Sequence, residues 1–277
     1  MAATVVRVAA LADLHCTRTS QGAFQPIFTR IRESADVLLV AGDLTHYGLQ
    51  DEARVLAKEL GSLRMPAAAV LGNHDFESGH AEEIAAIMRD AGLVVLEGDA
   101  CELAGIGVAG VKGFGGGFGK HALAPWGEGV IKQFVREAVD EALKLESALA
   151  RLRTSSLVAL LHYSPIQETV EGEPLEIYPF LGSSRLEEPL NRYPVSMVLH
   201  GHAHRGRLLG ATRAGVPVHN VSMPLLARTF VDRSPFRVFE VPTAAPLDGA
   251  AAAGPTGGRR ATDAGGVHRA GLPVKSS

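Results

Sequence analysis

Five short apolar runs, each followed by residue types that bind metals, restrict the fold of this chain more than any other feature. The runs have the length of buried β-strands and lie at Val5–Leu11, Val37–Val40, Ala67–Leu71, Leu157–Leu161 and Val195–Leu199. The polar side chains that follow them are Asp13 with His15, Asp43, Asn73 with His74, His162, and His202 with His204. In α/β sheets, binding sites gather outside the carboxyl ends of the strands. The sequence therefore predicts one site built from five distant segments.

The segment Val198–His204, which reads Val-Leu-His-Gly-His-Ala-His, has the densest group of candidate ligands. Residues two apart in an extended chain project to the same side, so His202 and His204 are expected to face one way. Neutral imidazole is the commonest metal-ligating side chain. His200 is instead expected to pack at the end of its strand. Glycine permits a close approach of the backbone and precedes three of the five clusters, at Gly42, Gly72 and Gly201.

Helices are expected between the strands wherever apolar residues recur every three or four positions. They are predicted at Pro26–Glu33, Gln50–Leu60, 84–91 with Gly92 closing it, Val130–Arg153 and Ser184–Arg192. The first three alternate with the first three strands. Such a βαβαβ series predicts a largely parallel sheet with helices packed on it.

The middle of the chain changes rhythm. Three short strands at Leu93–Glu97, Ala100–Leu103 and Ile106–Ala109 are expected to form a local meander, and the last strands are expected at Val216–Val221 and Phe236–Val241. The acidic segment Gln167–Gly182 contains Pro and Gly and is expected to be a loop. The glycine-rich residues 113–119 lack the Lys-Ser/Thr pair of a phosphate-binding loop, and they are interpreted as a mobile loop over the site.

Composition excludes several classes of protein. The net charge is −3, from 27 Lys and Arg against 30 Asp and Glu, so no nucleic-acid partner is expected. No apolar run reaches the roughly 18–20 residues that span a bilayer, and no membrane partner is expected. The N-terminus shows no secretory pattern, and the two cysteines, Cys16 and Cys101, form no disulfide framework. These features indicate a cytoplasmic protein.

The domain organisation follows from a change of composition near residue 243. Residues 1–242 are predicted to form one catalytic domain. Residues 243–277 are rich in Ala, Gly and Pro and offer almost no apolar surface to bury, so a disordered tail is expected there.

The ordered series Asp-Leu-His, Gly-Asp, Gly-Asn-His-Asp, His and Gly-His-Ala-His resembles the calcineurin-like metallophosphoesterase family, and in particular its compact bacterial branch, which includes cyclic-nucleotide phosphodiesterases. The resemblance spans residues 13 to 204. It implies an α/β fold in which two mixed β-sheets are sandwiched between helices. It also implies hydrolysis of phosphoric mono- or diesters by a hydroxide shared between two divalent metal ions.

The resemblance assigns the ligands by position. One metal would be held by Asp13, His15, Asp43 and His204, and the second by Asp43, Asn73, His162 and His202, with the carboxylate of Asp43 bridging the two. Carboxylate, amide and imidazole ligands together suit Mn²⁺, Fe²⁺, Co²⁺ or Zn²⁺ and do not select among them. His74 resembles the catalytic histidine of the family, which assists the leaving oxygen.

His46 departs from the family pattern, because the family commonly has an aspartate three residues after the bridging one. That aspartate orients the catalytic histidine. A neutral imidazole at this position can accept a hydrogen bond from His74 but cannot stabilise an imidazolium as a carboxylate does. His46 therefore orients His74 more weakly, or contacts the phosphate itself, or is merely tolerated. We include His46 with His74 as a candidate catalytic residue.

The function predicted from these features is a two-metal-dependent phosphoesterase acting on a small phosphorylated substrate. Two alternatives stay open. The first is a nuclease or pyrophosphatase of the same superfamily, although a nuclease would be expected to show a basic DNA-facing surface. The second is a binding scaffold that keeps the fold without catalysis. Such a scaffold is disfavoured because all seven ligand positions and His74 are filled.

Overall fold

The computed structural model describes residues 4–243 of the 277 in the chain. The segment predicted to be a disordered tail lies outside the described residues, apart from Thr243 at the end of a strand. In the described part of the chain, no helix is both long enough and apolar enough to cross a membrane.

The first sheet of residues 4–243 contains five strands in the order β11-β1-β2-β3-β4. They are β1 (Thr4–Leu11), β2 (Val37–Ala41), β3 (Ala67–Val70), β4 (Val94–Val95) and β11 (Arg237–Thr243). β1 to β4 run parallel, as the βαβαβ series predicts, and β11 is antiparallel to β1. Leu11 pairs with Val40 and Ala41 pairs with Val70, so the carboxyl ends of these strands lie at one edge of the sheet.

The second sheet contains six strands in the order β5-β6-β7-β8-β10-β9 among the residues that the structure describes. They are β5 (Asp99–Leu103), β6 (Ile106–Val111), β7 (Leu157–Leu161), β8 (Val195–His200), β9 (Leu209–Ala211) and β10 (Pro217–Asn220). β6, β7, β8 and β10 run parallel, and the edge strands β5 and β9 are antiparallel to their neighbours. β7 and β8 therefore bring two further candidate clusters to one edge of this sheet.

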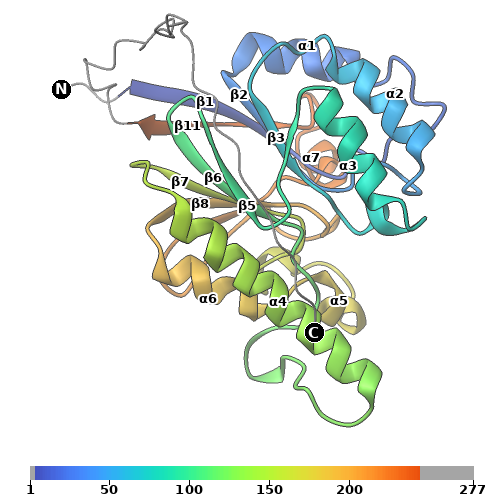
Figure 1. Ribbon diagram of the computed structural model, residues 1–277. Coiled ribbons are helices and arrows are strands. Elements are labelled where there is room, and N and C mark those ends of the chain that lie inside the picture. Colours follow the sequence, from blue (N-terminus) through green and yellow to red (C-terminus); the bar gives the residue numbers. More distant parts are fainter. Residues whose placement is uncertain (1–3, 244–277) are drawn as a thin grey trace, which may run out of the picture. The chain divides into compact units, whose positions relative to one another are not determined.

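The two sheets lie between two groups of helices, as Figure 1 shows. The outer face of the first sheet is covered by α1 (Gln25–Ser34), α2 (Gln50–Leu60) and α3 (Ala81–Asp90), and that of the second by α4 (Gly129–Arg151) and α6 (Ser184–Arg192). The inner faces of the sheets pack on each other. This arrangement confirms the predicted fold of two mixed sheets sandwiched between helices.

Burial on both faces explains why the strands read as continuous apolar runs. In β1, Ala9 and Leu11 pack toward α1, α2 and α3, whereas Val8 and Ala10 pack toward the second sheet. All four side chains are inaccessible to solvent. Because side chains alternate along a strand, a strand between two apolar layers needs apolar residues at every position.

The predicted meander of residues 93–109 is wrong. Val94 and Val95 pair with β3 in the first sheet, whereas β5 and β6 pair with each other in the second. Leu96, which follows β4, is buried between the two sheets. The chain crosses from one sheet to the other at this point, and local hydrophobicity does not reveal the crossing.

Several short elements have no counterpart among the predictions. These are β9, α5 (Tyr178–Leu181), α7 (Met223–Thr229) and 3₁₀ turns at His74–Phe76, Gly119–His121, Glu168–Val170 and Leu175–Ile177. Two of the turns and α5 lie within the expected loop 167–182. Elements of three to seven residues are too short to show a hydrophobic period.

The glycine-rich residues 113–119 pack against the segment that leads into α6. Gly116 donates its N–H to the carbonyl of Pro179 (2.6 Å), and Gly117 donates to the carbonyl of Gly182 (2.9 Å). Residues 115–118 are buried. Gly113, Gly116 and Gly117 have positive φ. The glycines thus allow a tightly packed backbone path, where the sequence suggested a loose cover over the site.

Candidate metal centre

The five predicted clusters meet where the carboxyl ends of β1, β2, β3, β7 and β8 face one another across the two sheets. The loops that follow β1 and β2 are joined by backbone hydrogen bonds, from Asp13 N–H to the carbonyl of Gly42 and from His15 N–H to the carbonyl of Asp43, each 3.0 Å long. The loops after β7 and β8 are joined from Gly201 N–H to the carbonyl of His162 (3.2 Å). The backbone itself therefore fixes the spacing of the clusters.

Asp13, His15 and His204 form one group whose ligand atoms lie within 4.8 Å of one another. The Nε2 atoms of His15 and His204 are 3.5 Å apart, and His204 Nε2 is 3.5 Å from Asp13 Oδ1. The carboxylate of Asp13 also accepts the backbone N–H of His202, at 3.1 and 3.0 Å to its two oxygens. The group contains three of the four residues assigned by resemblance to one metal ion.

Asp43, His162 and His202 form a second group of the same kind. His162 Nε2 lies 3.4 Å from Asp43 Oδ1 and 2.9 Å from Asn73 Oδ1. All four residues assigned to the other ion are therefore together. The two groups meet at Asp43, whose Oδ2 atom lies 3.7 Å from His15 Nε2.

Backbone carbonyls determine which imidazole nitrogens are free to bind an ion. His162 donates its Nδ1–H to the carbonyl of Ala41 (2.9 Å), and His202 donates its Nε2–H to the carbonyl of Phe180 (3.0 Å). Neutral imidazole carries one N–H, so His162 Nε2 and His202 Nδ1 keep lone pairs. Carbonyl groups in this position are typical partners of metal-ligating histidines. No sequence pattern points to the contribution of Phe180, because it comes from a backbone atom.

The contact between His162 and Asn73 shows that these residues fit a cation. With its proton on Nδ1, His162 presents a lone pair at Nε2 to the amide oxygen of Asn73, which also only accepts. Two acceptors 2.9 Å apart repel unless positive charge lies between or beside them. Asp43 Oδ1, 3.4 Å from His162 Nε2, adds a further oxygen donor at the same place.

Burial sets the protonation of the group. It lowers the pKa of His15 and of His162 to about 4 and that of His202 to about 3, so these rings are neutral at pH 7. Burial and the neighbouring Asp13 and Asp75 raise the pKa of Asp43 to about 9. Burial acts in the same direction on Asp13, but His204 and His162 together hold its pKa below the usual value. Bound cations would replace the proton on Asp43.

Backbone strain is concentrated at the same residues. Six non-glycine residues of the described chain have positive φ, and four of them are Asp13 (60°), His15 (44°), Asp43 (51°) and His202 (69°). Left-handed conformations are uncommon for residues other than Gly, although Asn, Asp and His adopt them more often than the rest, and they cluster at functional sites. All four belong to the predicted ligand set.

The glycines before the clusters allow the loops to lie close together, as predicted. A Cβ atom at Gly42 would lie 2.5 Å from His162 Nδ1, and one at Gly201 would lie 2.5 Å from Ala12 Cβ. At Gly72 it would overlap the carboxylate of Asp43. A methyl group at any of the three would displace a loop of the site.

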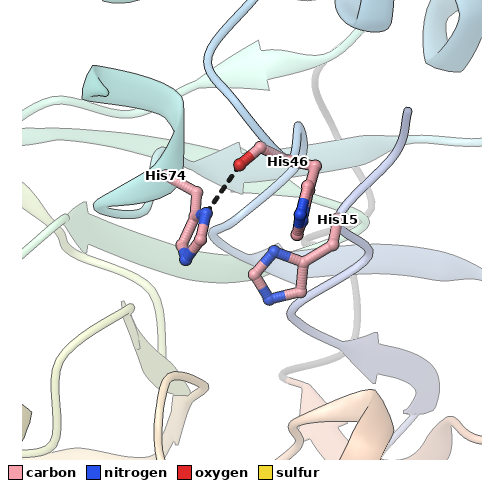
Figure 2. A group of neighbouring side chains, drawn as sticks. All are labelled: His15, His46 and His74. Atoms are coloured by element: carbon pink, nitrogen blue, oxygen red, sulfur yellow. Dashed lines mark hydrogen bonds between the residues drawn. The ribbon is translucent and has the colours of Figure 1, made fainter. Parts of the chain in front are cut away.

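His74 lies beside the first group, close to His15 and His46 (Figure 2). Its Nδ1–H donates to the backbone carbonyl of His46 (2.6 Å), so its Nε2 is free. The imidazole of His46 stacks on His74, with ring centroids 5.5 Å apart, and its Nδ1 atom is buried without a partner in the described residues. The backbone carbonyl of His46 thus orients His74, and the described residues show no hydrogen bond from His74 to the side chain of His46, which was one of the three roles left open.

Asp75 is a structural residue that belongs to the Gly-Asn-His-Asp motif and received no role from the sequence. Its side chain is fully buried, and it accepts from Gly72 N–H (2.8 Å), Thr45 N–H (2.8 Å), Thr45 Oγ1–H (2.6 Å) and Leu44 N–H (3.2 Å). It thereby ties the loop that carries Asn73 to the loop that carries Asp43. Burial raises the pKa of this carboxyl group, and the four donors oppose the rise.

We expect Asp75→Asn to lower the free energy of unfolding by about 2–4 kcal/mol, because an amide nitrogen would face backbone donors that need an acceptor. Urea denaturation measures the change. Asp90→Asn, at the exposed end of α3, is the matched control and should change stability by less than about 0.5 kcal/mol. Equal stability of the two variants would contradict the role assigned to Asp75.

His200 takes the structural role expected of it, and Cys16 is a buried structural residue as well. His200 is fully buried, and its Nε2 lies 2.8 Å from Thr169 Oγ1, away from the ligand groups. Cys16 is buried, and burial raises the pKa of its thiol to about 12. Neither side chain belongs to either of the two ligand groups.

The fold and the site together define an α/β sandwich with His and Asp groups that are able to hold metal at the strand ends. Residues 6–206 match the model of the calcineurin-like phosphoesterase family. The chain belongs to this family. Family membership and the two ligand groups support a phosphoesterase-type hydrolase.

Solved structures with a similar fold include the phosphopantetheinyl hydrolase of Mycobacterium tuberculosis, which is 17% identical in sequence and superposes with a TM-score of 0.59. The aligned region covers 84% of this chain and 95% of the hydrolase chain. A second is TT1561 of Thermus thermophilus, which is 15% identical in sequence and superposes with a TM-score of 0.50. The aligned region covers 86% of this chain and 99% of the TT1561 chain. At these identities the likeness shows the fold alone. No protein among those with curated descriptions matches the sequence.

Proposed function

We propose that this protein is a two-metal-dependent hydrolase of phosphoric esters that acts on a small phosphorylated substrate. The observation that carries the proposal is the position of Asp43 between the two ligand groups. Its Oδ1 atom lies 3.4 Å from His162 Nε2, and its Oδ2 atom lies 3.7 Å from His15 Nε2. One carboxylate that serves two adjacent groups is the arrangement required of a bridging ligand.

The ligands divide by position. Asp13, His15 and His204 would hold one ion, and Asn73, His162 and His202 would hold the other, with Asp43 shared. The ions, when bound, would activate water near neutral pH and neutralise the phosphoryl oxygens. The metal is proposed to be Mn²⁺, Fe²⁺ or Zn²⁺, because imidazole and carboxylate ligands suit all three.

His74, when its ring carries a second proton on Nε2, is proposed to give that proton to the leaving oxygen. Its Nδ1–H is held by the carbonyl of His46, so the ring is fixed with Nε2 directed away from that carbonyl. Its backbone N–H donates to Asp43 Oδ1 (2.9 Å), which places His74 beside the shared carboxylate. General acid catalysis by a positioned histidine typically contributes about 10²–10⁴-fold in rate.

The proposal is tested by turnover of bis(4-nitrophenyl) phosphate with and without added Mn²⁺. Monoesters, cyclic nucleotides, pyrophosphates and a phosphopantetheine diester complete the panel, the last because one similar structure is named a phosphopantetheinyl hydrolase. Metal-dependent hydrolysis of at least one member is expected. If the protein binds two metal ions but hydrolyses no substrate of the panel, it would instead be the binding scaffold.

We expect His46→Asp to change kcat by less than about tenfold, whereas His74→Ala lowers it by about 10²–10⁴-fold. The backbone carbonyl that orients His74 remains in the first variant and loses its partner in the second. Steady-state kinetics on one diester substrate measures both. A collapse of activity in His46→Asp comparable with that in His74→Ala would show that the His46 imidazole itself contacts the substrate.

A further inference from the structure

We propose that His15, His46 and His74 form a third metal site beside the two-metal centre, and that a borderline ion such as Zn²⁺ bound there inhibits hydrolysis. The binding part stands on the geometry of the three rings. The inhibition part rests on the proposed function, because it requires His74 to act on the leaving group.

The three histidines come from three separate loops and lie close together (Figure 2). They follow β1, β2 and β3, and each offers a nitrogen within 4.8 Å of the other two. The ring of His15 lies 4.5 Å from that of His74 and 5.4 Å from that of His46, centroid to centroid. Three imidazoles at this spacing are able to share one ion.

The nitrogens available to such an ion are not used elsewhere in the described chain. His15 Nδ1 and His46 Nδ1 are buried and have no hydrogen-bond partner. His74 Nδ1 is engaged with the carbonyl of His46, so its Nε2 is free. Buried nitrogens without partners carry an unfavourable desolvation energy, which coordination of a cation relieves.

The donor set selects the ion. Imidazole-only sites favour Zn²⁺, Cu²⁺ and Ni²⁺, whereas Mn²⁺ and Mg²⁺ favour sites that include oxygen donors. The proposed two-metal centre has carboxylate and amide oxygens, and this third group has none. Zn²⁺ is therefore expected to fill it at concentrations at which Mn²⁺ does not.

His15 would serve two ions at once, because its Nε2 atom faces Asp43 and His204 while its Nδ1 atom is the unpartnered one. Binding through both nitrogens removes the single N–H proton of the neutral ring, which passes to solvent. The ion would also engage His74 Nε2, the atom proposed to protonate the leaving oxygen. Excess Zn²⁺ is thus expected to inhibit by occupying His74.

The experiment counts Zn²⁺ bound to the full-length chain by equilibrium dialysis and atomic emission. His46→Gln removes one ligand while keeping a side chain of similar reach. His80→Ala, an exposed histidine outside the cluster, is the matched control. Three ions per chain are expected for the unmodified protein and for the control, and two for His46→Gln. A second variant, His46→Leu, should also bind two Zn²⁺ ions per chain if the loss of one ion in His46→Gln reflects a lost ligand rather than altered folding.

Turnover measured against rising Zn²⁺ provides the second readout. The unmodified protein should gain activity and then lose at least about tenfold as Zn²⁺ rises, and His46→Gln should lack the falling limb. An equal number of ions in the unmodified protein and both His46 variants would overturn the third site. Loss of one ion in these variants, with no phosphoester hydrolysed by any form, would support the site and refute the hydrolase.

Discussion

Asp43→Asn is expected to lower metal-dependent turnover by about 10³-fold or more, which corresponds to about 4 kcal/mol of transition-state stabilisation. The substitution removes the negative charge that faces both ligand groups, from Oδ1 at 3.4 Å to His162 and from Oδ2 at 3.7 Å to His15. Both ions would lose a ligand from a single change. Steady-state kinetics at saturating Mn²⁺, together with a count of bound metal, measures the effect.

The fold should survive this substitution. Asn has nearly the same shape as Asp and tolerates the positive φ of 51° at this position. Its amide oxygen is able to accept the N–H of His74 as Asp43 does now. Asp51→Asn, on the exposed start of α2, is the control and should keep full activity. Near-normal turnover by metal-loaded Asp43→Asn would exclude a bridging role.

The layers of the fold were predictable because burial on both faces of a sheet requires apolar residues at nearly every position of its strands. Strands such as Val5–Leu11 and Leu157–Leu161 are apolar at nearly every position, and helices such as Gln50–Leu60 show one apolar stripe. The structure has a strand with the predicted bounds Leu157–Leu161 and a helix with the predicted bounds Gln50–Leu60. The crossing at Val94–Leu96 was not predictable. A two-residue strand carries no period, and its partner in β3 is chosen by tertiary packing.

The ligand groups were predictable for a related reason. Parallel strands place the residues after their carboxyl ends at one edge, so Asp13, Asp43 and His202 could be expected near each other from the sequence alone. What holds the histidines in position could not be foreseen. The carbonyls of His46 and Phe180 carry no side-chain identity, and Asp75 resembles any other acidic residue until its four donors are seen.

Removal of metal is the second large effect that we expect. Raising the pH should increase the affinity for metal but lower the stability of the metal-free chain. Chelation should abolish hydrolysis. Because Asp43 has a pKa of about 9 in the folded chain, an incoming ion must displace its proton at any lower pH. Between pH 7 and pH 8.5, Mn²⁺ affinity is therefore expected to rise about tenfold per pH unit. Titration calorimetry measures the affinity.

The stability of the metal-free chain should change in the other direction over the same range. The folded chain keeps a proton on Asp43 that the unfolded chain, with an ordinary carboxyl pKa, has released, so raising the pH favours unfolding by up to about 1.4 kcal/mol per unit. His204, whose folded pKa is also raised, acts with the same sign. His15 and His162, whose pKa values are lowered, destabilise the fold only below about pH 6.5, outside this range.

Urea denaturation at pH 7 and pH 8.5, with chelator and with saturating Mn²⁺, should show the stabilities of the metal-free and metal-bound forms diverging. Parallel curves would mean that metal binding does not displace the proton of Asp43.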